Sequence, residues 1–217
     1  MTEAQLRDEI CRVGASLFAR GYVHATAGNI SVRLPEGGFL ITPTDACLGA
    51  LEPSRLARVN QAGEQLSGDR ASKTLTLHRR IYGADADAHC VIHTHSTHLV
   101  ALSLQQSGPV EELLPPITPY FVMKVGHVPI IPYHRPGDPA VGELVAQRIQ
   151  QMQAAGTPIR AVMLARLGPN VWHRSPAEAS AVLEELEESA KLMLLTRAAP
   201  LNPQQIDELR RQFGASW

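Results

Sequence analysis

Four histidines lie within residues 88–98, and they are His89, His93, His95 and His98. Residues 90–92 form a short, apolar and partly β-branched run that is typical of a buried strand. Alternate residues of a strand share one face, so we expect His93 and His95 to point the same way at the strand's end. Two imidazoles aimed together suit a divalent transition metal. Histidines that only form hydrogen bonds in the core or at the surface would give the same pattern, which therefore leaves both interpretations open.

Two further segments carry polar groups that suit a phosphate. In residues 26–33 (TAGNISVR), Gly28 and Asn29 can adopt backbone angles that other residues avoid. Such a turn can aim its N–H groups and the Asn29 amide at an anion. Residues 42–45 (TPTD) offer hydroxyl groups, including that of Thr44. Taken alone, each segment is explained equally well by an ordinary turn beside a strand.

A helix is predicted over residues 72–82, with Ser72 as its N-cap residue. Lys73 then lies in the first turn, where a cation opposes the helix dipole. This slightly unfavourable placement favours a functional role for the Lys73 side chain. A solvated surface lysine is an equally good interpretation of this position.

The remaining pattern predicts the elements that must position these groups. Further helices are expected over residues 3–20, 96–104, 140–155, 175–196 and 202–213. Two hairpins and four other strands are expected over residues 30–34, 39–42, 58–60, 64–66, 90–92, 128–133, 160–165 and 171–172. The acidic run 184–188 is expected on the solvated face of its helix, and residues 119–126 carry no clear signal. No linker divides residues 1–217, so we predict one α/β domain with helices flanking a largely antiparallel sheet.

Composition argues against some classes of binding partner and indicates the cellular compartment of the protein. A formal net charge of −1 and 5% aromatic residues argue against nucleic acid and against an anionic membrane surface. No apolar run approaches the roughly 18 residues that a membrane-spanning helix needs. The three cysteines form no CxxC pair, and the polar, acidic N-terminus does not resemble a signal peptide. We therefore expect a cytoplasmic protein with reduced thiols.

Taken together, the motifs resemble the class II aldolase/adducin family in order and spacing. The likeness covers nearly the whole chain and rests on residues 26–33, residues 41–44, Ser72 with His78 and Tyr82, and residues 91–95. It implies a three-layer α/β/α domain with a largely antiparallel central sheet, usually a homotetramer with active sites near subunit interfaces. It also implies a divalent metal, with Zn²⁺ expected, and a phosphorylated sugar as substrate. Carried over by position, the metal ligands are His93 and His95, and the phosphate-binding residues are Gly28, Asn29, Thr44 and Ser72.

Three positions depart from the family pattern. Thr74 stands where the aldolases carry a glutamate that acts as acid or base and can ligate the metal, and Lys73 stands where a phosphate-binding serine is usual. Leu167 occupies the position of the third metal histidine, and leucine cannot coordinate a metal. The third ligand is therefore missing, replaced by water, or supplied from elsewhere, with His134 and His127 as candidates.

These departures, with residues 94–101 and 167–172, most resemble one subgroup of the family, the 3-oxo-tetronate 4-phosphate decarboxylases of four-carbon sugar-acid catabolism. The implied reaction gives dihydroxyacetone phosphate and CO₂, with Lys73 as the catalytic residue, either as proton donor or as a fixed positive charge. A decarboxylase handles no proton on an aldehyde oxygen, so it tolerates Thr74 more readily than an aldolase does. The alternatives are an aldolase or epimerase acting on another sugar phosphate, and a non-catalytic assembly module.

Overall fold

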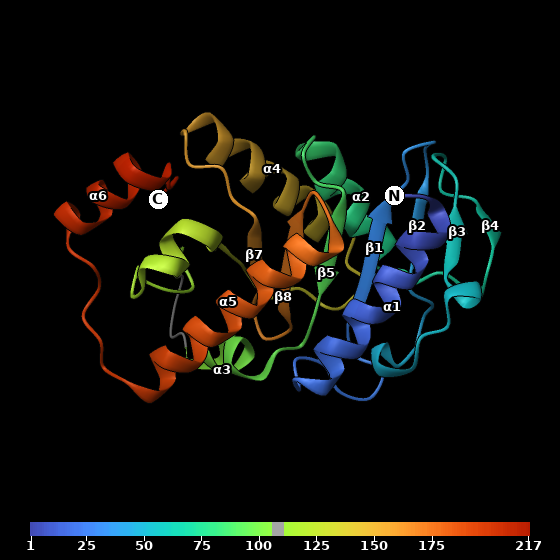
Figure 1. The fold of residues 1–217 in the computed structure, drawn as a ribbon, viewed down its shortest axis with the longest axis horizontal. Coiled ribbons are helices and arrows are strands. Elements are labelled where there is room, and N and C mark those ends of the chain that lie inside the picture. The colour runs from blue at the N-terminus through green and yellow to red at the C-terminus, as the bar shows by residue number, and fades with distance from the viewer. Residues whose placement is uncertain (106–110) are drawn as a thin grey trace.

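The structure is a computed structural model that describes residues 1–105 and 111–217. It is built on one eight-stranded sheet with the strand order β4-β3-β2-β1-β5-β8-β7-β6 (Figure 1). Neighbouring strands are antiparallel except for β6 and β7, which are parallel. The strands are β1 (Asn29–Arg33), β2 (Phe39–Ile41), β3 (Ala57–Val59), β4 (Gln65–Ser67), β5 (Cys90–His93), β6 (Ile130–Ile131), β7 (Ala161–Leu164) and β8 (Gly168–His173). The prediction of a largely antiparallel sheet is confirmed.

Helices cover both faces of this sheet. The α-helices are α1 (Glu3–Ala19), α2 (Leu75–Ala84), α3 (Thr97–Gln105), α4 (Ala140–Ala154), α5 (Pro176–Leu195) and α6 (Pro203–Phe213). Figure 1 shows α1 and α5 crossing the near face of the sheet, with α6 at one end of the molecule. Three short helical turns are η1 (Leu48–Ala50), η2 (Pro53–Arg55) and the π-helical turn η3 (Phe121–Val125). None of the helices in the described ranges combines the length and apolar character needed to cross a membrane.

The alternation of side chains along β5 separates two hydrophobic clusters. Ile92 and its cross-strand partner Val171 pack with residues of α1, α3 and α5. Val91 and its partner Trp172 face the other way and pack with residues of α2 and α4. His93 lies two residues after Val91, so its side chain belongs to the face that α2 and α4 cover.

Most predicted elements appear within a few residues of their expected bounds, and the differences have local causes. The N-cap residue of α2 is Thr74, and the helix begins at Leu75, so the expectation for Ser72 is wrong. Ser72 instead closes a turn before the helix, because its carbonyl oxygen accepts from Leu75 N and its Oγ accepts from Thr74 N. The strand expected over residues 128–133 is limited to two residues by the prolines on either side of β6.

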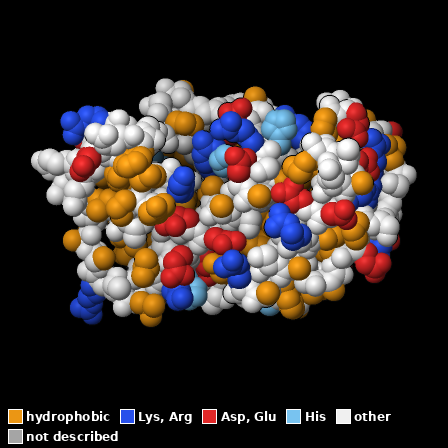
Figure 2. All heavy atoms as spheres, in the orientation of Figure 1, with side chains coloured by type: hydrophobic (Ala, Val, Ile, Leu, Met, Phe, Trp, Pro, Cys, Tyr) orange, Lys and Arg blue, Asp and Glu red, His pale blue; other side chains and the backbone are white. Residues whose placement is uncertain are grey.

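Figure 2 shows acidic and basic side chains interspersed over the near face of the molecule, whose formal net charge is −1. One acidic residue of α5 is not on that solvated surface. The Glu187 side chain is only 4% exposed, because it lies against the start of α3. Its carboxylate accepts from the backbone N–H groups of His98 (3.0 Å) and Leu99 (3.2 Å), and it lies 2.8 Å from His98 Nδ1. For Glu187, the expectation of a solvated face is wrong.

Replacing Glu187 with alanine is expected to lower the free energy of unfolding by about 3 kcal/mol, because it leaves buried donors at the N-terminus of α3 unpaired. The matched control is Glu188→Ala, which removes a carboxylate that is 54% exposed. That control is expected to change stability by no more than about 0.5 kcal/mol. Urea unfolding followed by circular dichroism measures both values. Equal stabilities of the two variants would contradict this account of Glu187.

Candidate active site

His93 is the centre of a row of polar side chains that runs across three strands. In the registers of the sheet, His93 of β5 lies directly opposite Asn29 of β1 on one side and Asn170 of β8 on the other. Directly opposite residues in antiparallel strands have Cβ atoms about 4.5–5.5 Å apart and point to the same face. All three side chains are buried. The strand ends therefore place one imidazole between two amides on the face that α2 and α4 cover.

The orientation of the His93 ring suits a metal ligand. Its Nδ1 atom lies 2.9 Å from the carbonyl oxygen of Pro169, which can only accept, so Nδ1–H is the donor. This bond fixes the tautomer and leaves Nε2 with a lone pair, an arrangement common for histidines that bind metals. Burial and the nearby His95 ring lower the pKa of His93 to about 4, so the ring is neutral near pH 7.

The structure brings His95 to His93, as the spacing predicts. Their ring centroids are 5.1 Å apart with an angle of 72° between the ring planes. A third ring, that of His24, lies 6.4 Å from His95 and is one that the sequence analysis missed. Burial and His24 both lower the pKa of His95. Within residues 1–105 and 111–217, no three His, Cys, Asp or Glu side chains are placed so that they could already share one metal ion.

Two glycines allow neighbouring turns to close on the segment that carries these histidines. Gly28 has a φ of +85°, and a Cβ atom there would lie 2.8 Å from the carbonyl oxygen of His93. Gly168 has a φ of +151°, and a Cβ atom there would lie 1.9 Å from the carbonyl oxygen of Thr94. A side chain is strained at a positive φ, and neither backbone contact leaves room for one. The two glycines thus hold the histidine segment between the turn before β1 and the start of β8.

The predicted phosphate-binding residues converge on the start of α2. Asn29 Nδ2 donates to Thr74 Oγ1 at 3.2 Å, and Thr74 Oγ1 lies 3.1 Å from Ser72 Oγ. The turn that carries Thr44 lies beside the segment that leads to Ser72, because Thr44 N donates to the carbonyl oxygen of Arg70 at 2.8 Å. Lys73 is exposed between these groups and has no ion-pair partner among the residues that the structure describes. Gly28, Asn29, Thr44 and Ser72 therefore come from three segments to one region beside the histidines.

Buried polar atoms in this region lack partners. Asn29 Oδ1, His78 Nε2 and both amide atoms of Asn170 form no hydrogen bond within the described part of the chain. His78 Nδ1 lies 2.8 Å from Ser31 Oγ, and burial, followed by the influence of His93, lowers the pKa of His78 to about 3. Each unpaired buried polar atom costs about 1–3 kcal/mol. Neutral histidines beside unpaired amides fit a divalent metal together with the oxygen atoms of a substrate.

The two histidines named from the sequence as candidates for the third metal ligand, His127 and His134, contact other side chains. The ring of His127 stacks on Trp217 with centroids 4.2 Å apart, and its Nδ1 lies 3.4 Å from Glu112. His134 Nδ1 lies 3.1 Å from Asp138 Oδ2. Neither ring joins the His93–His95 pair in a metal-binding group within the described residues.

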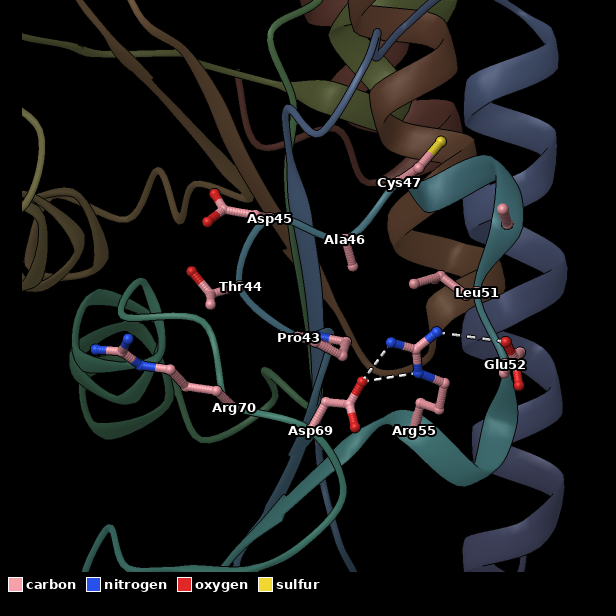
Figure 3. Close-up of a pocket in the computed structure, with 11 residues that line it drawn as sticks. Pro43, Thr44, Asp45, Ala46, Cys47, Leu51, Glu52, Arg55, Asp69 and Arg70 are labelled. Carbon is pink, nitrogen blue, oxygen red and sulfur yellow. Dashed lines mark hydrogen bonds and ion pairs between the residues drawn. The ribbon is translucent and has the colours of Figure 1, made fainter.

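A pocket of about 420 Å³ lies on the other side of the turn that carries Thr44. Figure 3 shows that Arg55 pairs with Asp69 and Glu52 in this pocket, whereas Thr44 and Asp45 point away from that pair. The pocket contains none of the histidines, and Thr44 is its one residue from the predicted site. It therefore adjoins the polar region around His93 and is distinct from it.

Comparison with known proteins shows the family of this chain. The family model described as "Class II Aldolase and Adducin N-terminal domain" matches residues 8–194. The chain belongs to the class II aldolase/adducin family. Proteins of this family typically depend on a divalent metal. A relative from Cupriavidus necator named 3-oxo-tetronate 4-phosphate decarboxylase is 53% identical over 223 residues, covering 100% of this chain and 99% of the relative.

Solved structures of the family confirm the fold. YgbL from Klebsiella pneumoniae, described as a putative aldolase/epimerase/decarboxylase, is 43% identical with a TM-score of 0.86, covering 97% of this chain and 100% of that one. L-fuculose-1-phosphate aldolase from Thermus thermophilus is 29% identical with a TM-score of 0.76, covering 92% of this chain and 100% of that one. The family resemblance inferred from the motifs is thus confirmed along nearly the whole chain.

Proposed function

We propose that this protein is a metal-dependent carboxy-lyase that converts 3-oxo-tetronate 4-phosphate to dihydroxyacetone phosphate and CO₂. The observation that carries the proposal is the pair of the buried His93 and the partly buried His95 beside three converging segments with phosphate-binding chemistry. The 53% identity to a relative with that name supports the choice of substrate. Release of the two products in equal amounts tests the proposal directly.

The reaction breaks the bond between C1 and C2 of a β-keto acid. C1 leaves as CO₂, the electron pair passes into the C3 carbonyl as an enolate, and a proton added at C2 gives dihydroxyacetone phosphate. A divalent metal held by His93 and His95 would supply Lewis-acid stabilisation of the negative charge that develops on the C3 oxygen. Zn²⁺ is the proposed ion, because neutral imidazole nitrogens are among its preferred ligands.

The chain's own residues hold the substrate and handle the proton. Gly28, Asn29, Thr44 and Ser72 bind the phosphate, which orients the C1–C2 bond for cleavage. Thr74, which stands in place of the family glutamate, binds Asn29 and Ser72 through its hydroxyl group. This supporting role is sufficient because decarboxylation places no proton on an aldehyde oxygen.

Lys73 is proposed to deliver the proton to C2. Loss of this proton donor in Lys73→Met is expected to lower turnover about 10²–10³-fold with little change in KM, because general acid catalysis contributes about 10²–10⁴-fold to the reaction rate. The control is Lys191→Met, which removes an exposed surface amine. Steady-state kinetics at saturating substrate separate the two constants. Unchanged turnover with a raised KM would show that Lys73 only neutralises substrate charge.

An aldolase acting on another sugar phosphate is the second candidate, favoured by the 29% identity to an L-fuculose-1-phosphate aldolase over 92% of this chain. Its discriminating test is aldol cleavage of L-fuculose 1-phosphate. If this protein neither cleaves that ester nor forms CO₂, and binds no metal, the assembly-module alternative is favoured.

A homotetramer in the cytoplasm is also proposed. Large apolar side chains that include Tyr120, Leu195 and Phe213 are more than 60% exposed. Figure 2 shows hydrophobic side chains gathered toward the end of the molecule where α6 lies. Exposed apolar groups in such a cluster favour contact with another protein surface. Light scattering of the purified protein tests the expected mass of four chains.

A further inference from the structure

We propose that His24 is the third protein ligand of the divalent metal that His93 and His95 hold. The inference rests on the metal site of the proposed function and adds a residue from a separate segment of the chain. Protein zinc sites use three or four side-chain ligands, and two histidines alone make an incomplete set. Leu167 cannot complete it, because its side chain has no donor atom.

The placement of His24 is the first support. Its ring centroid lies 6.4 Å from that of His95 with an angle of 69° between the planes, whereas His93 and His95 are 5.1 Å apart at 72°. The two ring pairs thus share a similar interplanar angle, and the His24 ring lies farther from the shared His95 ring. His24 is exposed, so rotation of its side chain can close the remaining gap.

The backbone of His24 is held close to the site. Its carbonyl oxygen accepts from Ala27 N at 2.9 Å, which closes the turn before Gly28. The preceding residue, Val23, is buried, and Gly28 is in contact with the carbonyl oxygen of His93. A fixed backbone with an exposed ring lets His24 reach an ion without disturbing β1 or β5.

The other histidines have contacts of their own or lie outside the cluster. His78 binds Ser31 through Nδ1 and keeps Nε2 unpaired within the described residues, and His98 binds Glu187. The remaining contacts are those of His127 with Glu112, His134 with Asp138 and His173 with Glu178. His89 is exposed before β5 begins. Among the histidines that the structure describes, only His24 joins His93 in forming a ring pair with His95.

Co²⁺ titration of the metal-stripped full-length protein, followed by visible absorption and by competition with Zn²⁺, tests this inference. His24→Ala is expected to weaken Co²⁺ binding by about 100-fold or more, since losing even an outer-shell partner of a ligand costs about 10–100-fold. His24→Gln, which keeps hydrogen-bonding capacity, is expected to weaken it equally. The control is His89→Ala, which removes an exposed histidine from residues 88–98, the segment that carries His93 and His95. This variant is expected to bind Co²⁺ like wild type.

The outcomes separate this inference from the proposed function. If His93→Asn abolishes Co²⁺ binding while His24→Ala binds like wild type, His24 is not a ligand and the two-histidine site stands. Unchanged Co²⁺ affinity in His24→Ala with a raised KM that His24→Gln restores would also overturn the inference, because the ring would then bind substrate. If wild type binds no Co²⁺, both the inference and the proposed metal site fail.

Discussion

Replacing Gly168 with alanine is expected to remove most of the activity and to lower the free energy of unfolding by about 3 kcal/mol. The added Cβ atom would lie 1.9 Å from the carbonyl oxygen of Thr94 and 3.3 Å from the Cα atom of His95. Both contacts are with backbone, so no flexible side chain can move aside. The segment between His93 and His95 must shift, and the geometry of the two rings changes with it.

Gly156→Ala is the matched control for this prediction. Gly156 also has a positive φ, +77°, but a Cβ atom there would meet nothing within 4 Å. Gly156→Ala is expected to lower the free energy of unfolding by about 1 kcal/mol, because it adds backbone strain alone. The variant is expected to keep full activity. Urea unfolding and turnover measured on both variants distinguish strain from steric overlap. If the two variants are equally stable and equally active, β8 does not lie against the histidine segment as described.

Replacing His93 with asparagine is expected to lower turnover at least about 10³-fold, equivalent to about 4 kcal/mol of lost transition-state stabilisation. The asparagine amide can still donate to the carbonyl oxygen of Pro169, as Nδ1 does in the native protein. The Nε2 lone pair is lost, so the variant is also expected to lose tightly bound metal. This design separates loss of the ligand from loss of the hydrogen bond that fixes β5 to the start of β8.

The control for the histidine variant is His89→Asn, which changes an exposed residue just before β5. It is expected to keep wild-type metal content and turnover. Elemental analysis after gel filtration gives the metal content, and circular dichroism checks the fold of both proteins. Full metal content and full activity in His93→Asn would remove His93 from the proposed site.

Much of the fold could be predicted because local signals agree with the tertiary arrangement. The Thr2–Gln5 capping box begins α1, and the Ser175 N-cap begins α5, as expected. The alternating pattern of β1 and β2 predicts their pairing, and in β2 successive residues pack in different hydrophobic clusters, Leu40 in one and Phe39 and Ile41 in the other. The rings of His93 and His95 lie 5.1 Å apart, as a strand's period of two predicts, and β5 itself ends at His93.

The features that could not be predicted depend on contacts between distant segments. The burial of Glu187 follows from its contact with the start of α3, and an acidic run carries no local sign of that contact. His24 lies in a turn far from β5 in the sequence, and only the close approach of Gly28 to His93 brings it near. The row formed by Asn29 and Asn170 likewise depends on the strand order and register.

The most direct test of the proposed function is a coupled assay for CO₂ and dihydroxyacetone phosphate from enzymatically generated 3-oxo-tetronate 4-phosphate, with and without a chelator. The account predicts that both products form in equal amounts and that the chelator stops their release until Zn²⁺ or a similar divalent ion is restored. Product release that persists after complete metal removal would contradict the metal site. Absence of both products from folded, metal-loaded protein would contradict the decarboxylase.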